Sequence, residues 1–323
     1  MSDDFRPTAS WPMLRLRDAL LRKTRAFFHE RAFIEVETPL LSADVVVDLH
    51  LEPFAVDIPR GSGEPRRMWL QTSPEFAMKR LMAAGGEAIF QIAHAFRQDE
   101  QGRLHNPEFT LVEWYRGGDG LAEGMRLLSD FAEALLERSA AEAISYQEAF
   151  ERHAGIDPHT APGSALADAA RRCDVTAPKS LLADDRDGWL DLLLVELVEP
   201  RLGFSRPAIL YDYPASQAAL ARVRPGPPTV AERFELYVDG IELANGYHEL
   251  LDAAVLVERN RANNRARQAA GKPLLPEDSR LLAAMRAGLP DCAGVALGFD
   301  RMVMLAAGAA TIADVLTFPS DRA

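Results

Sequence analysis

Cysteine is scarce in this chain: only Cys173 and Cys292 occur among 323 residues. Two cysteines so far apart exclude a disulfide framework, a Cys-x-x-Cys zinc site and a paired thiol redox centre. Long apolar runs are also missing, and this excludes a membrane-spanning helix, which needs about 20 consecutive apolar residues. With 48% hydrophobic residues, the chain nevertheless has enough apolar material for a substantial core.

Basic residues are outnumbered, with 36 Lys and Arg against 48 Asp and Glu, so the formal net charge is −12. This balance argues mildly against a nucleic-acid partner, since phosphate binding needs a local excess of basic side chains. The acidic N-terminus, Met1–Asp4, lacks the basic-then-apolar order of a signal peptide, so we expect a cytoplasmic protein. No G-x-G-x-x-G or G-x-x-x-x-G-K-[ST] loop occurs, which disfavours a Rossmann or P-loop fold.

Hydrophobic periodicity predicts a mixture of helices and strands without regular alternation between them. Helices are expected at 14–31, 253–270 and 300–307, and strands at 88–97, 109–116, 232–239, 241–250 and 294–299. Residues 117–230 contain helical stretches and little sign of a site. Strands joined by short turns, with helices set apart, predict an α+β fold in which helices flank an antiparallel sheet.

A first candidate site surrounds Arg97, which ends a predicted strand, and Asn106 in the loop that follows. A guanidinium offers forked donors to phosphate oxygens and stays charged, so the loop is a candidate polyphosphate site; a solvated hairpin tip is the alternative. In the next strand, alternation puts Glu113 and Tyr115 on one face, where together they can hold an ammonium group. The alternative there is a Tyr at a sheet edge beside a solvated Glu.

Two acids farther along are candidate Mg²⁺ ligands. Glu242 and Glu249 are seven residues apart and would point to opposite faces of a regular strand. Asn245-Gly246 offers the positive φ of a bulge, which would return both carboxylates to one face; an Asn-Gly hairpin turn with exposed acids is the alternative. Arg301 is expected in the first turn of a helix, where a cation opposes the helix dipole, so it indicates an anion partner or a salt bridge.

In this order, the segments resemble the three signature motifs of class II aminoacyl-tRNA synthetases. Phe33–Pro39 is similar to motif 1, Phe96–Tyr115 to motif 2 and Gly294–Arg301 to motif 3. The phrases Gln71–Glu75 and His105–Phe109 are similar to the lysyl subgroup. Any one motif is weak, but the ordered set is specific and covers nearly the whole chain.

Lysyl-tRNA synthetases carry an N-terminal anticodon-binding β-barrel of about a hundred residues, and the segment before residue 33 has no room for it. The chain therefore most closely resembles the short paralogues of that enzyme. The resemblance implies a single catalytic domain over 1–323 with a mainly helical insertion at about 117–230. It also implies a homodimer, with motif 1 in the interface.

The same resemblance implies that ATP and Mg²⁺ are used to activate β-lysine or lysine as an adenylate, and that a lysine side chain of elongation factor P accepts the lysyl group. Arg97 would hold the α-phosphate, Arg301 the γ-phosphate, and Glu242 and Glu249 the metal. The other implied ATP-binding residues are Gln98, Asp99, Asn106, Phe109, Leu243 and Gly298. The implied amino-acid pocket consists of Ser73, Pro74, Glu75, Glu113, Tyr115, Glu249 and Ala296.

Two positions depart from the family's pattern. Asp99 stands where motif 2 has Glu, so Asp99 or Glu100 is the adenine contact. Ala296 stands where lysyl-tRNA synthetases have Gly, and the extra methyl would alter which lysine isomer fits, since small volume changes shift specificity by about 1–3 kcal/mol.

Three other functions and one surface are left open by the sequence. The functions are aminoacylation of tRNA through the same adenylate, a non-catalytic regulator derived from a synthetase, and a synthetase that makes a small amide such as asparagine. The Arg-rich segment 259–267 is either a docking patch for the protein acceptor or a solvated helix face.

Overall fold

The computed structural model describes residues 5–61 and 63–323 and divides into two compact units. The first consists of the described residues up to Gly118 together with Leu251–Ala323, and the second is Asp119–Leu250. Met1–Asp4, on which the expectation about targeting rests, lie outside the described part. Within the described ranges, no helix has the length and apolar character needed to cross a bilayer. The single domain with an insertion at about 117–230 stays a prediction.

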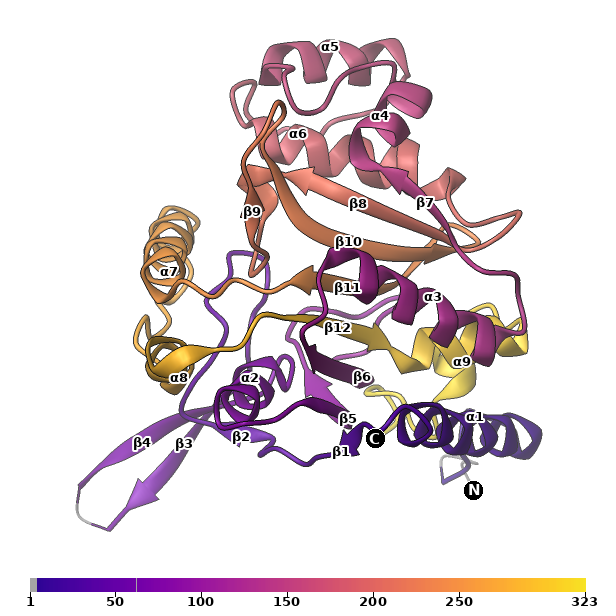
Figure 1. Ribbon diagram of the computed structural model, residues 1–323, viewed down its shortest axis with the longest axis vertical. Helices are drawn as coiled ribbons and strands as arrows, with labels where there is room; N and C mark the ends of the chain where they lie inside the picture. Colours follow the sequence, from indigo (N-terminus) through magenta and orange to yellow (C-terminus); the bar gives the residue numbers. More distant parts are fainter. Residues whose placement is uncertain (1–4, 62) are drawn as a thin grey trace. The chain divides into compact units, whose positions relative to one another are not determined.

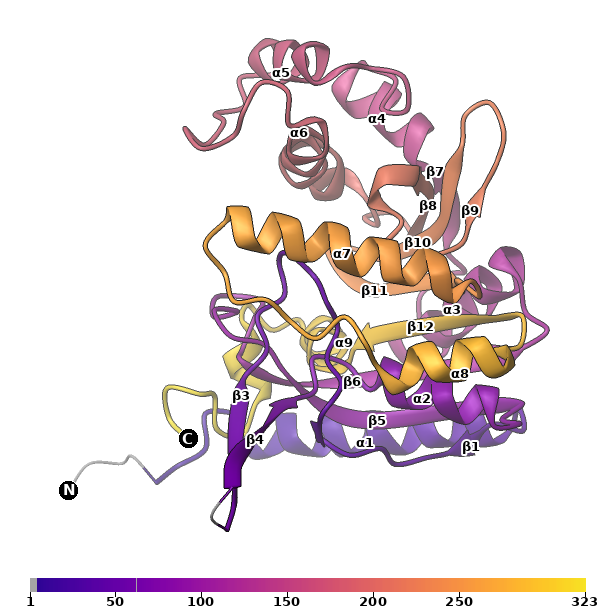
Figure 2. The same ribbon diagram turned by 90° about the vertical axis from the view of Figure 1, so that its left-hand side faces the viewer.

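An antiparallel sheet forms the centre of the first unit (Figure 1). β5 (Ala88–Phe96) pairs antiparallel with β6 (Glu108–Gly117), and β6 pairs antiparallel with β12 (Cys292–Gly298). The short β1 (Ile34–Glu35) runs parallel to β5. A separate sheet has the order β2 (Leu41–Ser42), β4 (Gly63–Leu70) and β3 (Ala55–Arg60). Figures 1 and 2 show the β3–β4 hairpin extending away from the rest of this unit.

Helices cover both faces of the β5–β6–β12 sheet, and one strand shows how. Thr110 on β6 accepts a hydrogen bond from Arg17 of α1 (Trp11–His29) at 2.8 Å, and its N–H donates to Asp300 of α9 (Phe299–Ala307) at 2.7 Å. Glu113 points to the opposite face by alternation and meets Ser73, just before α2. The helices of this unit are α1 (Trp11–His29), α2 (Glu75–Ala83), α7 (Ala253–Ala269), α8 (Arg280–Gly288), α9 (Phe299–Ala307) and the 3₁₀ turn η4 (Ile312–Val315).

The second unit contains five strands and has a core of its own. β10 (Val230–Val238) pairs antiparallel with β11 (Ile241–His248), β8 (Ala208–Pro214) and β9 (Val223–Arg224), while β7 (Glu142–Ser145) runs parallel to β8. Its helices are α3 (Leu121–Leu136), α4 (Tyr146–Ala154), α5 (Gly163–Arg172) and α6 (Arg186–Leu193), followed by the short turns η1 (Leu194–Val198), η2 (Glu199–Arg201) and η3 (Ala215–Gln217). Phe150, Leu190 and Tyr213 are buried in the core between them. Each unit thus confirms the α+β class with an antiparallel sheet flanked by helices.

The β10–β11 hairpin contains both a turn and a bulge, and their positions test the prediction for Asn245-Gly246. The turn is Asp239-Gly240, both with positive φ (52° and 73°), whereas Asn245 and Gly246 lie inside β11. The Asn-Gly hairpin turn is therefore wrong. Tyr237 pairs with Glu242 and Leu236 with Ala244, so Leu243 is the extra, bulged residue. A bulge exists as expected, but it lies at Leu243 and not at Asn245-Gly246.

Candidate active site

Glu113 on β6 is the centre of a buried polar cluster. Its Oε2 accepts a hydrogen bond from the Ser73 hydroxyl at 2.7 Å, and its Oε1 accepts one from the Tyr115 hydroxyl, also at 2.7 Å. Tyr115 and Glu113 lie on the same face of β6, two residues apart, as the alternation predicts. The alternative of a solvated Glu beside an edge Tyr is wrong, because both side chains are buried.

A second carboxylate and an ammonium complete this cluster. Lys79 Nζ donates to Glu75 Oε1 one helical turn away and lies 5.9 Å from the ring centre of Tyr115. Burial and the nearby Glu75 carboxylate raise the pKa of Glu113 from 4.5 to about 7, while hydrogen bonds from Tyr115 and Ser73 and the Lys79 charge oppose the rise. Sequence reasoning missed Lys79, although its i, i+4 spacing from Glu75 was a visible signal.

The wall of this cluster is formed by β12 and the start of α2. Ala296 lies directly opposite Glu113 in the β12–β6 register, so its methyl group borders the same pocket. Pro74 is the N-cap of α2, and the Ser73 hydroxyl accepts from the Glu75 N–H at 3.0 Å. The Ser73 hydroxyl thus accepts one hydrogen bond from the helix start and donates another to Glu113.

Arg97 follows β5 and is held beside the same loop. Its Nε donates to the Thr72 carbonyl at 3.3 Å, and its Nη1 lies 3.4 Å from Glu100 Oε1. The guanidinium lies 5.0 Å from the ring centre of Phe109, which is within cation–π range. Thr72 and Ser73 are consecutive, so the Arg97 guanidinium and the Glu113 carboxylate are anchored to neighbouring residues.

Arg301 contacts the loop that follows Arg97. It lies in the first turn of α9, as expected, and its Nε donates to the Leu104 carbonyl at 3.2 Å. Its Nη2 lies 2.6 Å from Nε2 of His105, which must accept this hydrogen bond because a guanidinium can only donate. Burial and the charge of Arg301 lower the pKa of His105, with a smaller contribution from Arg97, which agrees with a neutral imidazole. The charges of Arg97 and Arg301 therefore both lower the pKa of His105.

The other predicted nucleotide contacts of the first unit lie on the same loop or next to it. The Gln98 N–H donates to the Glu52 carbonyl at 2.8 Å. Asp99 is exposed, with φ of +63°. Glu100 lies against Arg97. An adenine contact through Asp99 and one through Glu100 both stay predictions.

Asn106 has its amide engaged inside the chain. Its Oδ1 accepts from the Ser320 N–H at 3.0 Å, and its Nδ2 donates to the Glu108 carbonyl at 2.6 Å. These bonds tie the C-terminal segment to the start of β6, and a contact between Asn106 and adenine stays a prediction. Gly298 ends β12 and is the N-cap of α9, where it leads directly into the turn that bears Arg301.

The two predicted metal ligands belong to the second unit. Glu242 lies on β11, and Glu249 directly follows that strand. With Leu243 bulged, the alternation of β11 continued by one residue puts both carboxylates on the same side of the chain. Glu249 has no exposed surface, and Glu242 is half-buried. Over residues 5–61 and 63–323, no group of three or more His, Cys, Asp or Glu side chains is arranged to hold a metal ion. Two carboxylates still suit Mg²⁺, which commonly takes one or two together with phosphates and water.

Comparison with known proteins decides the family. A family model described as tRNA synthetases class II (D, K and N) matches residues 4–322. The chain belongs to this family. This class II synthetase is 47% identical over 323 residues to the elongation factor P–(R)-β-lysine ligase of Salmonella arizonae. The match covers 99% of this chain and 98% of the Salmonella protein. The proteins of the same name from Salmonella paratyphi B and Salmonella schwarzengrund have the same identity and coverage.

Membership of the class II family and similarity to its short lysyl paralogues are thus confirmed. Within the first unit of this class II synthetase, the predicted phosphate contact Arg97 and the predicted amino-acid pocket around Glu113 adjoin through Thr72-Ser73. The predicted roles of the individual residues stay predictions, and they enter the proposal below.

Proposed function

We propose that this class II synthetase is an ATP-dependent ligase that activates (R)-β-lysine as an adenylate and transfers it to a lysine side chain of elongation factor P. Similarity to ligases of that name over nearly the whole chain supports the choice of amino acid and acceptor. The observation that carries the proposal is that Arg97 contacts the Thr72 carbonyl while the Ser73 hydroxyl contacts Glu113. This arrangement suits bringing an amino acid's carboxylate to a nucleotide's α-phosphate.

The charges of the buried cluster favour a cationic substrate. Glu75 and Glu113 supply two carboxylates, and Lys79 supplies one ammonium, so the fully ionised cluster has one negative charge in excess. A substrate ammonium would neutralise that charge and lower the raised pKa of Glu113, because an opposite charge favours the carboxylate. The excess carboxylate charge of the cluster is costly to bury without a partner, so it would favour binding of the substrate ammonium.

The proposed reaction has two steps. A carboxylate oxygen of β-lysine attacks the α-phosphorus of ATP, the bond from that phosphorus to the bridging oxygen breaks, and pyrophosphate leaves. The neutral ε-amine of the acceptor lysine then attacks the adenylate carbonyl, a C–N bond forms, the C–O bond to AMP breaks, and the amine loses a proton. No side chain need act as nucleophile, because positioning and charge stabilisation suffice.

The assigned roles follow the chemistry of each group. Arg97 stabilises the charge that develops on the α-phosphate, and Arg301, whose guanidinium is oriented by Leu104 and His105, holds the γ-phosphate. Glu242 and Glu249 would hold Mg²⁺, which would supply positive charge to neutralise the phosphates. Gln98, Phe109 and Gly298 lie on or beside the segments that carry the two arginines, in keeping with their assignment to ATP.

Intact-protein mass spectrometry tests the proposal. The synthetase is incubated with ATP, Mg²⁺, elongation factor P and either (R)-β-lysine or α-lysine. We expect the factor to gain the mass of one lysyl unit, with (R)-β-lysine the better substrate, and we expect no gain without ATP. Charging of tRNA while the factor stays unmodified would instead support the aminoacyl-tRNA alternative. Absence of pyrophosphate exchange with any lysine isomer would support a non-catalytic regulator.

Two further assignments belong to this proposal. A homodimer is supported by Ile34 on β1, an apolar side chain within motif 1 that is 65% exposed. Light scattering is expected to give twice the mass of the chain, and a monomer at micromolar concentration would contradict the assignment. Because the acceptor is a translation factor, we place the reaction in the cytoplasm.

A further inference from the structure

Helix α7 turns a polar face toward the interior of the first unit. Its buried side chains are Leu256, Asn260, Asn264 and Arg267, at the spacing of one helix face. Interior helix faces are normally apolar, and a buried polar group is costly unless it is hydrogen-bonded. Arg267, expected in a docking patch or on a solvated face, has no exposed surface, so both readings are wrong for this residue.

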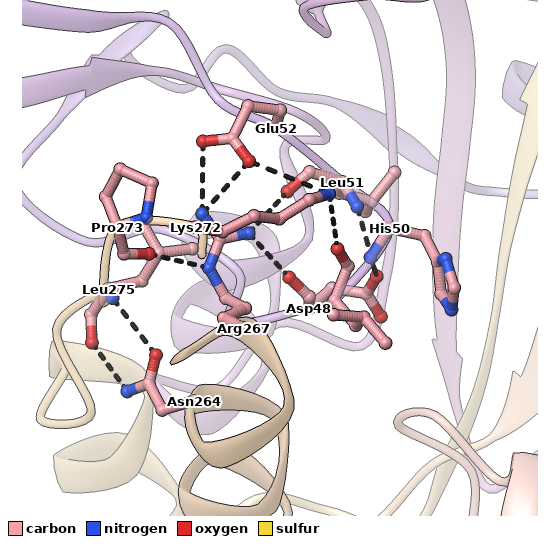
Figure 3. Close-up of polar contacts among 10 residues, drawn as sticks. Asp48, His50, Leu51, Glu52, Asn264, Arg267, Lys272, Pro273 and Leu275 are labelled. Atoms are coloured by element: carbon pink, nitrogen blue, oxygen red, sulfur yellow. Dashed lines mark hydrogen bonds and ion pairs between the residues drawn. The ribbon is translucent and has the colours of Figure 1, made fainter. Parts of the chain in front are cut away.

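Arg267 binds two other segments of the same unit (Figure 3). Its Nε donates to the Pro273 carbonyl at 2.8 Å, and its Nη1 donates to the carbonyls of Asp48 and Leu51 at 2.9 and 3.2 Å. Its Nη2 lies 3.0 Å from each carboxylate oxygen of Glu52. The planar fork of a guanidinium allows one side chain to reach all these acceptors, and a lysine ammonium has no such fork.

The loop 48–52 is also held by its own contacts. Asp48 Oδ1 accepts from the N–H groups of His50 and Leu51 at 2.7 and 3.1 Å, which closes a tight turn. Lys272 Nζ donates to the Leu49 carbonyl at 2.8 Å. The loop is therefore short, internally bonded and pinned from the α7 side, so its position depends on the residues at the end of that helix.

The other side of this loop meets the nucleotide segment. The Glu52 carbonyl accepts from the Gln98 N–H at 2.8 Å, and Gln98 directly follows Arg97. Glu52 is thus bonded through its carboxylate to Arg267 and through its carbonyl to the backbone of the predicted ATP site. A continuous chain of hydrogen bonds runs from the end of α7 to the residue after Arg97.

We propose that Arg267 is a positioning residue for ATP, which fixes Glu52 and through it the backbone at Arg97 and Gln98. The inference rests on the proposed function, where these two residues bind ATP. A buried ion pair is by itself weak evidence for stability, because the desolvation cost offsets most of the attraction. The effect of this ion pair is instead geometric, because it fixes the position of Glu52 and so of the backbone that Glu52 contacts at Gln98.

A KM comparison between two substitutions on α7 tests this role. Arg267→Met keeps most of the side-chain bulk and removes every donor, whereas Asn264→Ala removes another buried polar group on the same helix face. Within residues 5–61 and 63–323, Asn264 bonds to Leu275 and Glu277 and to no residue of loop 48–52. In pyrophosphate exchange, Arg267→Met is expected to raise KM for ATP about tenfold or more while KM for the lysine isomer stays within about twofold. Asn264→Ala is expected to lower stability and leave both KM values unchanged.

Hydrogen exchange gives a readout that does not need catalysis. Peptides covering 97–106 are expected to exchange faster in Arg267→Met than in wild type, and at the wild-type rate in Asn264→Ala. If Arg267→Met does not fold, Glu52→Gln replaces it, since an amide facing the guanidinium breaks one of the two Nη2 contacts with little change in shape. Wild-type KM for ATP together with wild-type exchange at 97–106 would overturn the inference. If the wild-type enzyme exchanges no pyrophosphate, the proposed function fails, and the hydrogen-exchange comparison still decides whether Arg267 positions this segment.

Discussion

Replacing Glu113 by Gln is expected to lower kcat/KM for the lysine isomer on the order of 100-fold while KM for ATP changes little. The introduced amide would still fill the space between Ser73 and Tyr115, which each lie 2.7 Å from the carboxylate in the wild type. The substitution removes the negative charge that we assign to the substrate ammonium and keeps the shape. Pyrophosphate exchange with varied amino acid and varied ATP separates the two KM values.

The same residue predicts a pH dependence. Burial and Glu75 raise the pKa of Glu113 to about 7, so part of the free enzyme has a protonated Glu113 near neutrality. We expect kcat/KM for the amino acid to rise with pH through about 7 and then level off, and this rise is expected to disappear in Glu113→Gln.

The stability of the protein is expected to change with pH in the direction opposite to that of kcat/KM. Because the folded-state pKa lies above the ordinary 4.5, the contribution of Glu113 to the free energy of unfolding is fully present below pH 4.5 and is lost as the pH rises through about 7. Glu113→Gln is expected to flatten this decline, measured by urea denaturation at several pH values.

Glu108→Gln is the matched control for Glu113→Gln. Glu108 lies on the same strand β6, but it is exposed and its carboxylate lies 2.9 Å from His94 Nδ1. Exposed ion pairs contribute only about 0–1 kcal/mol, so activity and its pH profile should stay as in the wild type. If the two substitutions had the same effect on kcat/KM, the assigned amine pocket would be wrong.

Local patterns in the sequence predicted the parts of the site that depend on one element. Alternation along β6 placed Glu113 and Tyr115 on one face, and the glycine-flanked segment before Arg301 predicted a strand leading into a helix. The β10–β11 hairpin shows the limit. Two Gly-containing pairs competed for the turn, and Asp239-Gly240 formed it, while Asn245-Gly246 stayed inside a strand that pairs with β10. Strand pairing overrode the local turn preference.

Contacts between distant segments could not be predicted in this way. The bond from Gln98 to Glu52 and those from Arg267 to loop 48–52 join residues far apart in the sequence, and no periodicity links them. An arginine on a helix with other arginines is typical of a solvated face. Only the fold shows that Arg267 lies on the buried side, where carbonyls and one carboxylate accept its hydrogen bonds.

Replacing Arg97 by Ala is expected to lower kcat for pyrophosphate exchange by about 1,000-fold or more, since arginines that stabilise charge in phosphoryl-group chemistry contribute 10³- to 10⁵-fold. The guanidinium is held by the Thr72 carbonyl, by Glu100 and by the face of Phe109, so its donors are oriented before a nucleotide binds. Such preorganisation lowers the cost of reorganising the site during the reaction. Arg97→Lys should restore little activity, because a point ammonium cannot contact Thr72 and a phosphate with a planar fork.

Arg67→Ala is the control for this substitution. Arg67 lies on the β3–β4 hairpin of the same unit and forms a forked pair with the exposed Asp57. Removing it also deletes one positive charge, so a loss of activity caused only by net charge would affect both variants alike. We expect Arg67→Ala to retain wild-type kcat, and both variants to keep a cooperative urea transition. A folded Arg97→Ala enzyme with wild-type kcat would exclude Arg97 from the reacting phosphate.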